Sequence, residues 1–283
     1  MALAYLTDVD IANHALSLLG VYKITSFAQA TVAAEKSGEL YPVVRDRLLR
    51  RHKWNFARAS VVLSPTWIAV TSITSNGGLI QVNKVAHGLA SASRVVMDET
   101  SSDGLYKITV VSADAFTLDG SVYTDAVVGR YTVAPIFGFS YIFSLPADCL
   151  MVRTINGWEN AQRAKEAFQI QGRQIIANCP SLDLVYTKQV TDVSLFDTSF
   201  EECLAMQLGI ELAMPITGAM DRRNKLTAEF QGVTLKNAMR SNAIEPSARI
   251  ISQAYGNPAV QSRIGMGGYD YASNVGAEPP FYP

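Results

Sequence analysis

The sequence predicts an α+β fold: a helical core with a β-hairpin or small sheet, an inserted all-β barrel domain and an extended C-terminal arm. Three observations predict it. Apolar residues recur at helical spacing near both ends of the 283-residue chain, short β-branched and aromatic runs fill a stretch between them, and the last residues follow no period. We expect a discontinuous core at 1–66 and 134–256, the barrel at 67–133 and the arm at 257–283.

Two helices are predicted near the N-terminus. The first follows Thr7, which can form a capping box with Asp10 three residues later, and it ends at Gly20. The second covers roughly 31–53, and Pro42 inside it should kink the helix or displace its start.

The pattern changes to that of strands between Trp67 and Val133. Five or six short runs lie here, and turn dipeptides such as Asn-Gly, His-Gly and Asp-Gly separate them. They read IAVTSI, LIQVNKV, SRVVM, YKITVV, AFTLDG and RYTVA. Strands of this number and length predict a small antiparallel barrel or sandwich, and the change of period predicts a separate domain.

Three further strand signals follow the barrel. Residues 141–152, YIFSLPADCLMV, predict a strand, a proline turn and a second apolar stretch. The runs AFQIQGRQIIAN and DLVYTKQV predict two strands of a hairpin that turns at 178–181.

The helical period returns at Asp197. The third helix begins with a possible capping box from Ser199 to Glu202 and ends at Met214-Pro215. Its apolar residues repeat every four positions, at Phe200, Leu204, Leu208 and Leu212. A fourth helix over about 219–242 is expected to run antiparallel to the third, and its apolar face is marked by Leu226, Phe230 and Val233.

The composition argues against a protein that binds nucleic acid tightly. The chain has 24 basic and 25 acidic residues and a net charge of −1, so it lacks the basic excess that phosphate binding needs. Charged residues are 17% of the chain, against about 25% in soluble domains. Burial against neighbouring subunits would explain this figure, and so would a monomer rich in Ser, Thr and Asn.

The sequence contains no recognisable catalytic, cofactor or metal motif. The spacings GxxxxGK[ST], HExxH and GxSxG are missing, and the three histidines His14, His52 and His87 fall in different predicted elements. The three cysteines are widely spaced and include no CxxC pair. We therefore expect no enzyme, cofactor or metal centre. The start of the chain lacks a signal-peptide pattern and no run of 18 apolar residues occurs, so we expect neither export nor a membrane span.

One segment has an unusual charge pattern. Residues 45–58, RDRLLRRHKWNFAR, hold six basic residues and one acidic residue, with Trp54 and Phe56 between them. One interpretation is a solvated helix face whose aromatic side chains end in the core. The other is a basic stripe that faces an acidic partner or passing nucleic acid. Its candidate partner-binding residues are Arg45, Arg47, Arg50, Arg51 and Lys53.

Four segments together resemble the tail tubular protein A family, the head-to-tail adaptors of tailed bacteriophages. They are DIANHALSLLG, the segment from Tyr41 through RDRLLRRHKWNFARAS, the strand YIFSLPADCLMV, and the final helix pair. The chain has Lys53 where that family often has Pro, and Met151 where it often has Arg. The resemblance covers about 7–65 and 137–242. The insert is similar to a small β-barrel repeat of phage structural proteins, which also occurs as a non-catalytic barrel in ubiquitin-activating enzymes.

The resemblance implies a structural protein of the virion tail or neck, assembled in the host cytoplasm. Its helical-bundle adaptor core would form a homo-oligomeric ring, expected to have twelve copies, between the portal protein and a downstream tail or nozzle protein. Viral DNA would pass through the ring without specific contacts during ejection, and the insert could hold fibres. The alternatives are a capsid-decoration or tail-fibre-docking protein, and an enzyme without known motifs.

The C-terminal arm is the second candidate partner-binding segment. Its prolines and glycines oppose a helix or a core, yet its apolar side chains are too many for a solvating tail. They are Ile264, Met266, Tyr269, Tyr271, Phe281 and Tyr282. We expect the arm to be disordered in the free subunit and to become ordered on the portal or on a neighbouring subunit. The alternative is an arm that lies across its own core.

Overall fold

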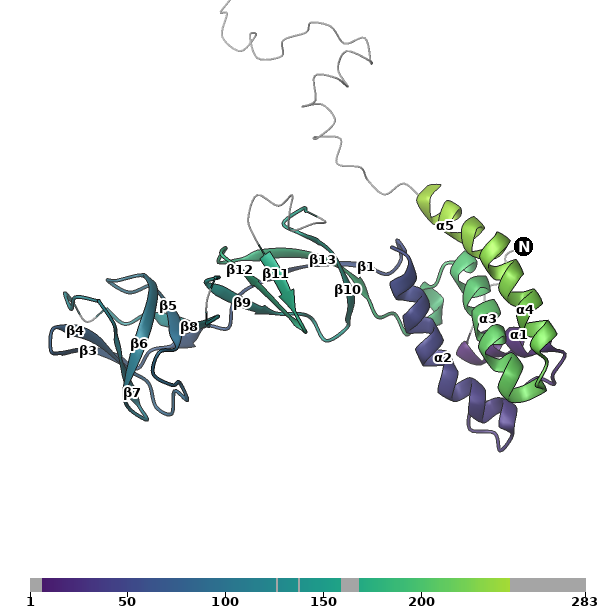
Figure 1. Cartoon of the computed structure of the whole chain (residues 1–283), viewed down its shortest axis with the longest axis horizontal. Helices are drawn as coiled ribbons and strands as arrows, with labels where there is room; N and C mark the ends of the chain where they lie inside the picture. Colours follow the sequence, from purple (N-terminus) through teal and green to yellow (C-terminus); the bar gives the residue numbers. More distant parts are fainter. Residues whose placement is uncertain (1–6, 126, 137, 159–167, 245–283) are drawn as a thin grey trace, which may run out of the picture. The chain divides into compact units, whose positions relative to one another are not determined.

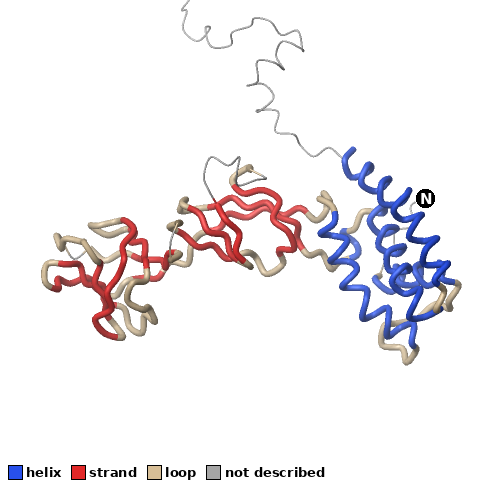
Figure 2. Tube along the Cα trace, in the orientation of Figure 1, coloured by secondary structure: helices blue, strands red, loops and turns tan. Residues whose placement is uncertain are grey.

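The computed structural model describes residues 7–125, 127–136, 138–158 and 168–244. Within them the chain has a mixed α+β architecture, with helices in its N-terminal part, strands in its middle and helices again towards the C-terminus (Figures 1 and 2). The chain divides into two units, Met1–Ala238 and Met239–Pro283.

The helices and helical turns cover all four ranges that the periodicity predicts, and among the described residues one 3-10 turn lies outside them. They are α1 (Asp8–Leu19), α2 (Val32–Arg51), the 3-10 turn η2 (Val193–Leu195), α3 (Thr198–Leu212), the π-helical turn η3 (Ala213–Thr217), α4 (Met220–Glu229), the π-helical turn η4 (Phe230–Thr234) and α5 (Leu235–Ile244).

The ends of α1 confirm the predicted caps. The Thr7 side chain accepts a hydrogen bond from the Asp10 amide, and the Asp10 carboxylate accepts one from the Thr7 amide at 3.1 Å. Gly20 follows the helix with a φ of 74°, a left-handed conformation that glycine adopts without strain. Helix α2 starts at the predicted place, after its N-cap Thr31, and Pro42 lies in its interior.

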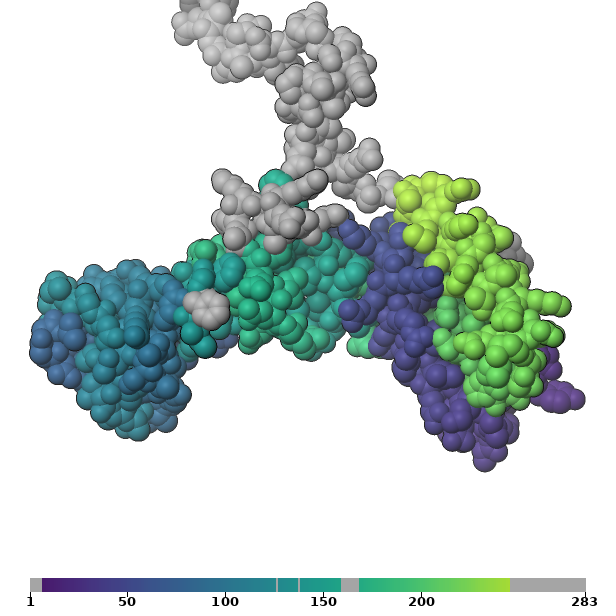
Figure 3. All heavy atoms as spheres, in the orientation of Figure 1, coloured from purple at the N-terminus to yellow at the C-terminus, as the bar shows by residue number. Residues whose placement is uncertain are grey.

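Helix α3 is the centre of the helical part. It packs against α1, α2 and α4, so segments from opposite ends of the sequence lie side by side (Figure 3). They share one apolar core. The four predicted apolar positions, Phe200, Leu204, Leu208 and Leu212, are all fully buried. Gly209 lies where α1 approaches, since a Cβ there would be 3.4 Å from the Ala15 carbonyl oxygen. Most of the residues of α3 are buried, as expected for a helix at such a central place.

The predicted capping box of α3 is wrong. Asp197, two residues earlier than Ser199, is the N-cap, and its carboxylate accepts a hydrogen bond from the Ser199 amide at 3.2 Å. At its other end α3 passes through η3, which contains Met214 and Pro215, and the turn closes at Gly218.

The apolar face predicted for the fourth helix is partly wrong. Leu226 and Phe230 are buried, but the Val233 side chain is 56% exposed. The π-helical turn η4 takes up one residue more per turn than an α-helix. It therefore rotates the following residues, and Thr234 and Leu235 face the core instead of Val233.

The strands form three antiparallel sheets, whose members are β1 (Arg58–Leu63), β2 (Ile68–Ala69), β3 (Ser72–Asn76), β4 (Leu79–Asn83), β5 (Arg94–Asp98), β6 (Gly104–Ser112), β7 (Ala115–Leu118), β8 (Arg130–Ala134), β9 (Tyr141–Ser144), β10 (Cys149–Ile155), β11 (Phe168–Gln171), β12 (Gln174–Ala177) and β13 (Leu182–Lys188). Their orders are β2-β8-β5-β6-β7-β4-β3, β1-β13-β10 and β11-β12-β9.

The seven-stranded sheet curls into a half-barrel. Its two edge strands, β2 and β3, are separated in sequence only by Val70 and Thr71. The Val70 amide donates to the Gly129 carbonyl, next to β8, whereas the Thr71 amide donates to the Asn83 carbonyl at the end of β4. The chain thus crosses from one edge of the sheet to the other within two residues, which requires the sheet to curve. The run IAVTSI is accordingly divided into two strands.

The hairpin predicted at 178–181 is wrong. Strand β12 pairs with β11 through a tight turn at Gly172-Arg173, and on its other side with β9. Strand β13 belongs to a different sheet, between β1 and β10. The Gly-Arg dipeptide inside AFQIQGRQIIAN is the true turn, and Gly172 has a φ of 59° there. The two three-stranded sheets share one apolar cluster, which includes Phe143, Ile175 and Leu184.

Candidate functional site: the basic segment and the helix–sheet joint

The basic segment begins with an arginine that faces inward. Arg45 is 7% exposed, and its Nε and Nη2 atoms both lie 2.8 Å from Oδ1 of Asp46. The second carboxylate oxygen of Asp46 accepts a hydrogen bond from the Gln189 side chain at 2.6 Å. Because Gln189 directly follows β13, this network ties the end of α2 to the sheet.

The other predicted cations are on the outside of the helical part. Arg47 forms an ion pair with Glu211 of α3 at 2.7 Å, and the Arg51 guanidinium lies 5.5 Å from the centre of the Phe230 ring. Arg50 and Lys53 have exposed side chains. Successive helical residues are rotated by about 100°, which brings Arg47, Arg50 and Arg51 to neighbouring positions while Arg45 faces the other way.

The aromatic residues of the basic segment pack into the apolar core of the helices. Trp54 is fully buried, and its indole N–H donates to the Leu48 carbonyl at 3.0 Å. Its ring lies edge-on to Phe200 at 5.1 Å, and Phe56 contacts both Phe196 and Phe200. This confirms that the aromatic side chains end in the core, and such edge-to-face pairs are a favoured geometry.

A buried arginine joins this segment to the sheet. Arg153 of β10 is 8% exposed and donates from Nη2 to the Trp54 carbonyl at 2.6 Å and from Nε to the Thr187 hydroxyl at 2.8 Å. Burial, with a smaller contribution from the nearby Arg58 cation, lowers the pKa of Arg153 to about 10. Sequence reasoning missed this residue. Its signal was a single arginine in the otherwise neutral strand CLMVRTI.

His52 lies at the same joint, directly after α2. Its ring lies edge-on to Trp54 at a centroid distance of 5.1 Å. Burial lowers the pKa of His52 below its ordinary value, and the cations Arg153 and Lys53 lower it further. The histidine is therefore neutral in the folded protein at pH 7.

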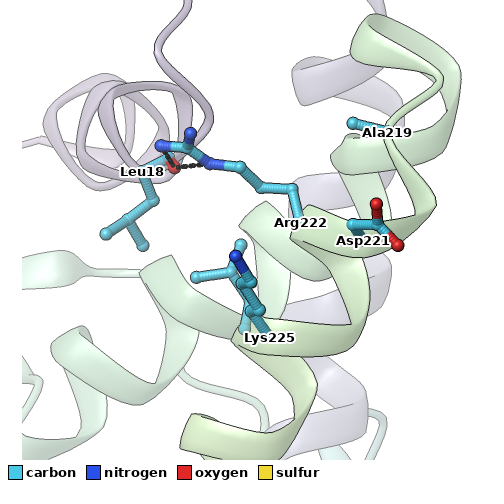
Figure 4. A pocket seen from close by; sticks show the side chains of 6 residues that line it. Leu18, Ala219, Asp221, Arg222 and Lys225 are labelled. Carbon is cyan, nitrogen blue, oxygen red and sulfur yellow. Dashed lines mark hydrogen bonds between the residues drawn. The ribbon is translucent and has the colours of Figure 1, made fainter.

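A shallow hollow of about 460 Å³ lies between α1 and the start of α4, lined in part by Leu18, Asp221, Arg222 and Lys225 (Figure 4). The Arg222 guanidinium donates two hydrogen bonds to the Leu18 carbonyl, at 2.6 and 2.9 Å. It thereby satisfies a carbonyl at the C-terminal end of α1. The hollow thus contains a structural contact between two helices.

The described residues contain no group of three or more His, Cys, Asp or Glu side chains that could hold a metal ion. The three cysteines are buried, and burial raises the pKa of Cys149 and, to about 12, that of Cys203. Thiolate nucleophiles need the opposite shift. No helix in the described part of the chain is long and apolar enough to span a membrane.

The second set of candidate residues lies outside the described residues. These are Ile264, Met266, Tyr269, Tyr271, Phe281 and Tyr282 of the arm.

Comparison with known proteins gave no match, either to a protein-family model or among the curated proteins.

Proposed function

We propose that the chain is a structural virion protein, a head-to-tail adaptor that forms a ring between the portal and the tail and lines part of the DNA conduit. The observation that carries this proposal is the order of the segments that resemble the tail tubular protein A family. One of them lies at the joint: HKWNFA supplies Trp54, whose carbonyl accepts a hydrogen bond from Arg153, the residue directly after the CLMV segment. The segments that resemble the family therefore lie next to the connection between helices and sheet.

The charges of the basic segment suit passage of DNA without tight binding. Arg45 and Arg47 are neutralised by Asp46 and Glu211, and the net charge of the chain is −1. Each unpaired cation that contacts phosphate adds to affinity through the release of counterions. A conduit subunit with few such cations would let DNA slide past.

In this proposal the helical adaptor core comprises 1–66 and 134–256, the half-barrel is an inserted domain at 67–133, and the arm at 257–283 contacts the portal or a neighbour. The half-barrel has an apolar cluster of its own, whose buried members all lie between Val70 and Tyr131. A separate apolar cluster supports the division of the chain into a core and an inserted domain.

The experiment is assembly with the portal. The purified protein is mixed with its portal protein and imaged by negative-stain electron microscopy, with portal alone as the control. We expect closed rings of about twelve subunits with a central hole, built from head-to-tail contacts, because cyclic closure requires heterologous interfaces. Monomers or two-fold dimers alone would overturn the proposal.

A second candidate is capsid decoration or tail-fibre docking, and the half-barrel favours it. This unit has an apolar cluster of its own and its entry and exit strands pair with each other, which is the organisation of a separate docking module. If the chain binds purified capsids or fibres but not portal, this second function replaces the first.

A further inference from the structure

The two edge strands of the sheet β1-β13-β10 differ in how well they are protected from pairing with a further strand. Strand β10 has two irregularities, between Cys149 and Met151 and between Val152 and Thr154, and Trp158 forms a bridge with Ile155 at its end. Bulges and covering segments are the usual protection of a sheet edge. Strand β1 pairs with β13 through six residues in unbroken register, and no described strand lies on its other side.

The side chains of β1 are those of a strand that lacks a neighbour. Ala59, Val61 and Leu63 face the same side as Leu182, Leu184 and Tyr186 of β13, which is the side of the apolar cluster. Val61 is nevertheless 36% exposed, and Val62 on the opposite face is 65% exposed. An added strand would cover both faces, which is the geometry of strand addition.

One run in the undescribed C-terminal residues has a composition that suits a strand beside β1. Residues 269–275, YDYASNV, lie between Gly268 and Gly276 and contain neither Pro nor Gly. Tyrosine and valine favour strands, and in an extended chain Tyr269, Tyr271 and Val275 would share one side. Twenty-four residues separate this run from Ile244, the last described residue.

Charge fixes the direction of pairing. Arg58 is the only charged residue of β1, and Asp270 is the only one in the run. A parallel alignment that sets Asp270 beside Arg58 spans all six residues of β1 and ends with Val275 beside Leu63. In this register Tyr271 and Val275 lie on the side of Ala59, Val61 and Leu63, the apolar side.

We propose that residues 269–275 of one copy add to the free edge of β1 in a second copy, as a parallel strand. The contact is heterologous, because each copy donates one segment and accepts another, so it can extend around a closed ring. It requires only a second copy of this chain and is independent of portal binding. Its failure would leave the proposed adaptor function intact, and failure of portal binding would leave this contact intact.

The test uses two full-length variants with complementary defects. Val62→Lys places a charge on the accepting edge, which disfavours strand addition, and its control is Val122→Lys, at a valine of similar exposure in the half-barrel. Tyr271→Pro removes an amide from the donated strand, and its control is Ala277→Pro, outside the run. Association is measured by analytical ultracentrifugation, and protection of the β1 amides by hydrogen exchange.

We expect the unchanged protein and both controls to associate in a concentration-dependent way with protected β1 amides. Each defective variant alone is expected to be monomeric, with β1 amides that exchange rapidly. An equimolar mixture of the two should form 1:1 dimers, because the Tyr271→Pro chain still accepts a strand and the Val62→Lys chain still donates one. A mixture that stays monomeric overturns the proposal, and so does a monomeric unchanged protein whose β1 amides are protected.

A charge exchange tests the direction of the strand. Arg58→Asp and Asp270→Arg should each weaken association, and the double variant Arg58→Asp/Asp270→Arg should restore it. A double variant no stronger than the single ones would overturn the parallel register.

Discussion

At the scale of single residues, the most consequential side chain is Arg153. It is a buried cation whose two hydrogen bonds go to neutral oxygens, the Trp54 carbonyl and the Thr187 hydroxyl. Both acceptors belong to fully buried residues. Burial of a charge is costly, and here the two hydrogen bonds connect β10 to β13 and to the segment that follows α2.

Replacing Arg153 with methionine should lower the free energy of unfolding by about 1–3 kcal/mol, because two buried acceptors lose their donors. The matched control is Arg173→Met. Arg173 also donates to backbone carbonyls, those of Pro146 and Ala147, but its side chain is exposed and water can replace it. We expect the control to change stability by less than about 0.5 kcal/mol. Equal losses in urea denaturation would show that Arg153 is an ordinary surface contact.

His52 makes the stability of the fold depend on pH. Burial first, and then the cations Arg153 and Lys53, lower the pKa of His52 in the folded state below the ordinary 6.5. The unfolded chain therefore binds a proton at a higher pH than the folded chain does. The contribution of neutral His52 is complete above pH 6.5 and is lost as the pH falls from 6.5 towards the lowered value.

We expect the free energy of unfolding to fall between pH 7 and pH 5, and His52→Gln to make this fall less steep. The measurement is urea denaturation at several pH values. His14, whose pKa burial also lowers, should produce part of the slope that remains. An identical pH profile in the variant would contradict the assignment.

At the scale of elements, the turn η4 decides which side of the last helix is buried. Leu235→Ala should cost about 2–5 kcal/mol, the range for a buried leucine, whereas Val233→Ala should be within about 0.5 kcal/mol of the unchanged protein. The reason is that Leu235 is 8% exposed and Val233 56% exposed. A continuous α-helix with the face predicted from Val233 would give the opposite order in chemical denaturation.

The elements that sequence could predict are those that local chemistry determines. The box at Thr7, the glycine at 20 and the four-residue repeat of α3 depend on neighbours within one or two turns, and all three are confirmed. The strands of the half-barrel also follow from local alternation and turn residues.

What sequence could not provide was pairing across long separations. Which strand lies beside β13 depends on β1, more than a hundred residues earlier, and no local signal at 178–181 contains that information. The π-helical turn was missed because the expected helix assumed a constant 3.6 residues per turn. In the candidate site, the sequence pattern was enough to identify the basic segment. Its hydrogen-bond and ion-pair partners Gln189, Glu211 and Arg153 come from distant elements, so no local pattern indicates them.

At the scale of the whole molecule, the half-barrel is expected to be removable. Its entry and exit strands pair with each other, since Ile68 is opposite Tyr131 and Ala69 is opposite Arg130. Neighbouring strands are about 4.8 Å apart, so a short linker can replace everything between them. Its apolar cluster is separate from those of the helices and of the other two sheets.

Replacing 67–133 with a short Gly/Ser linker should therefore leave the helical part folded. Closing a short loop costs little entropy when its ends are already adjacent. The replacement removes the edge-to-face contact between Trp67 and Tyr141, whose ring centres are 6.3 Å apart, so the remaining sheets should lose some stability. Helices α1, α2 and α3 should keep their common core. We expect helical circular dichroism and a cooperative thermal transition to persist. An unfolded or aggregated product would show that the half-barrel is part of the core and that the chain cannot be divided at these positions.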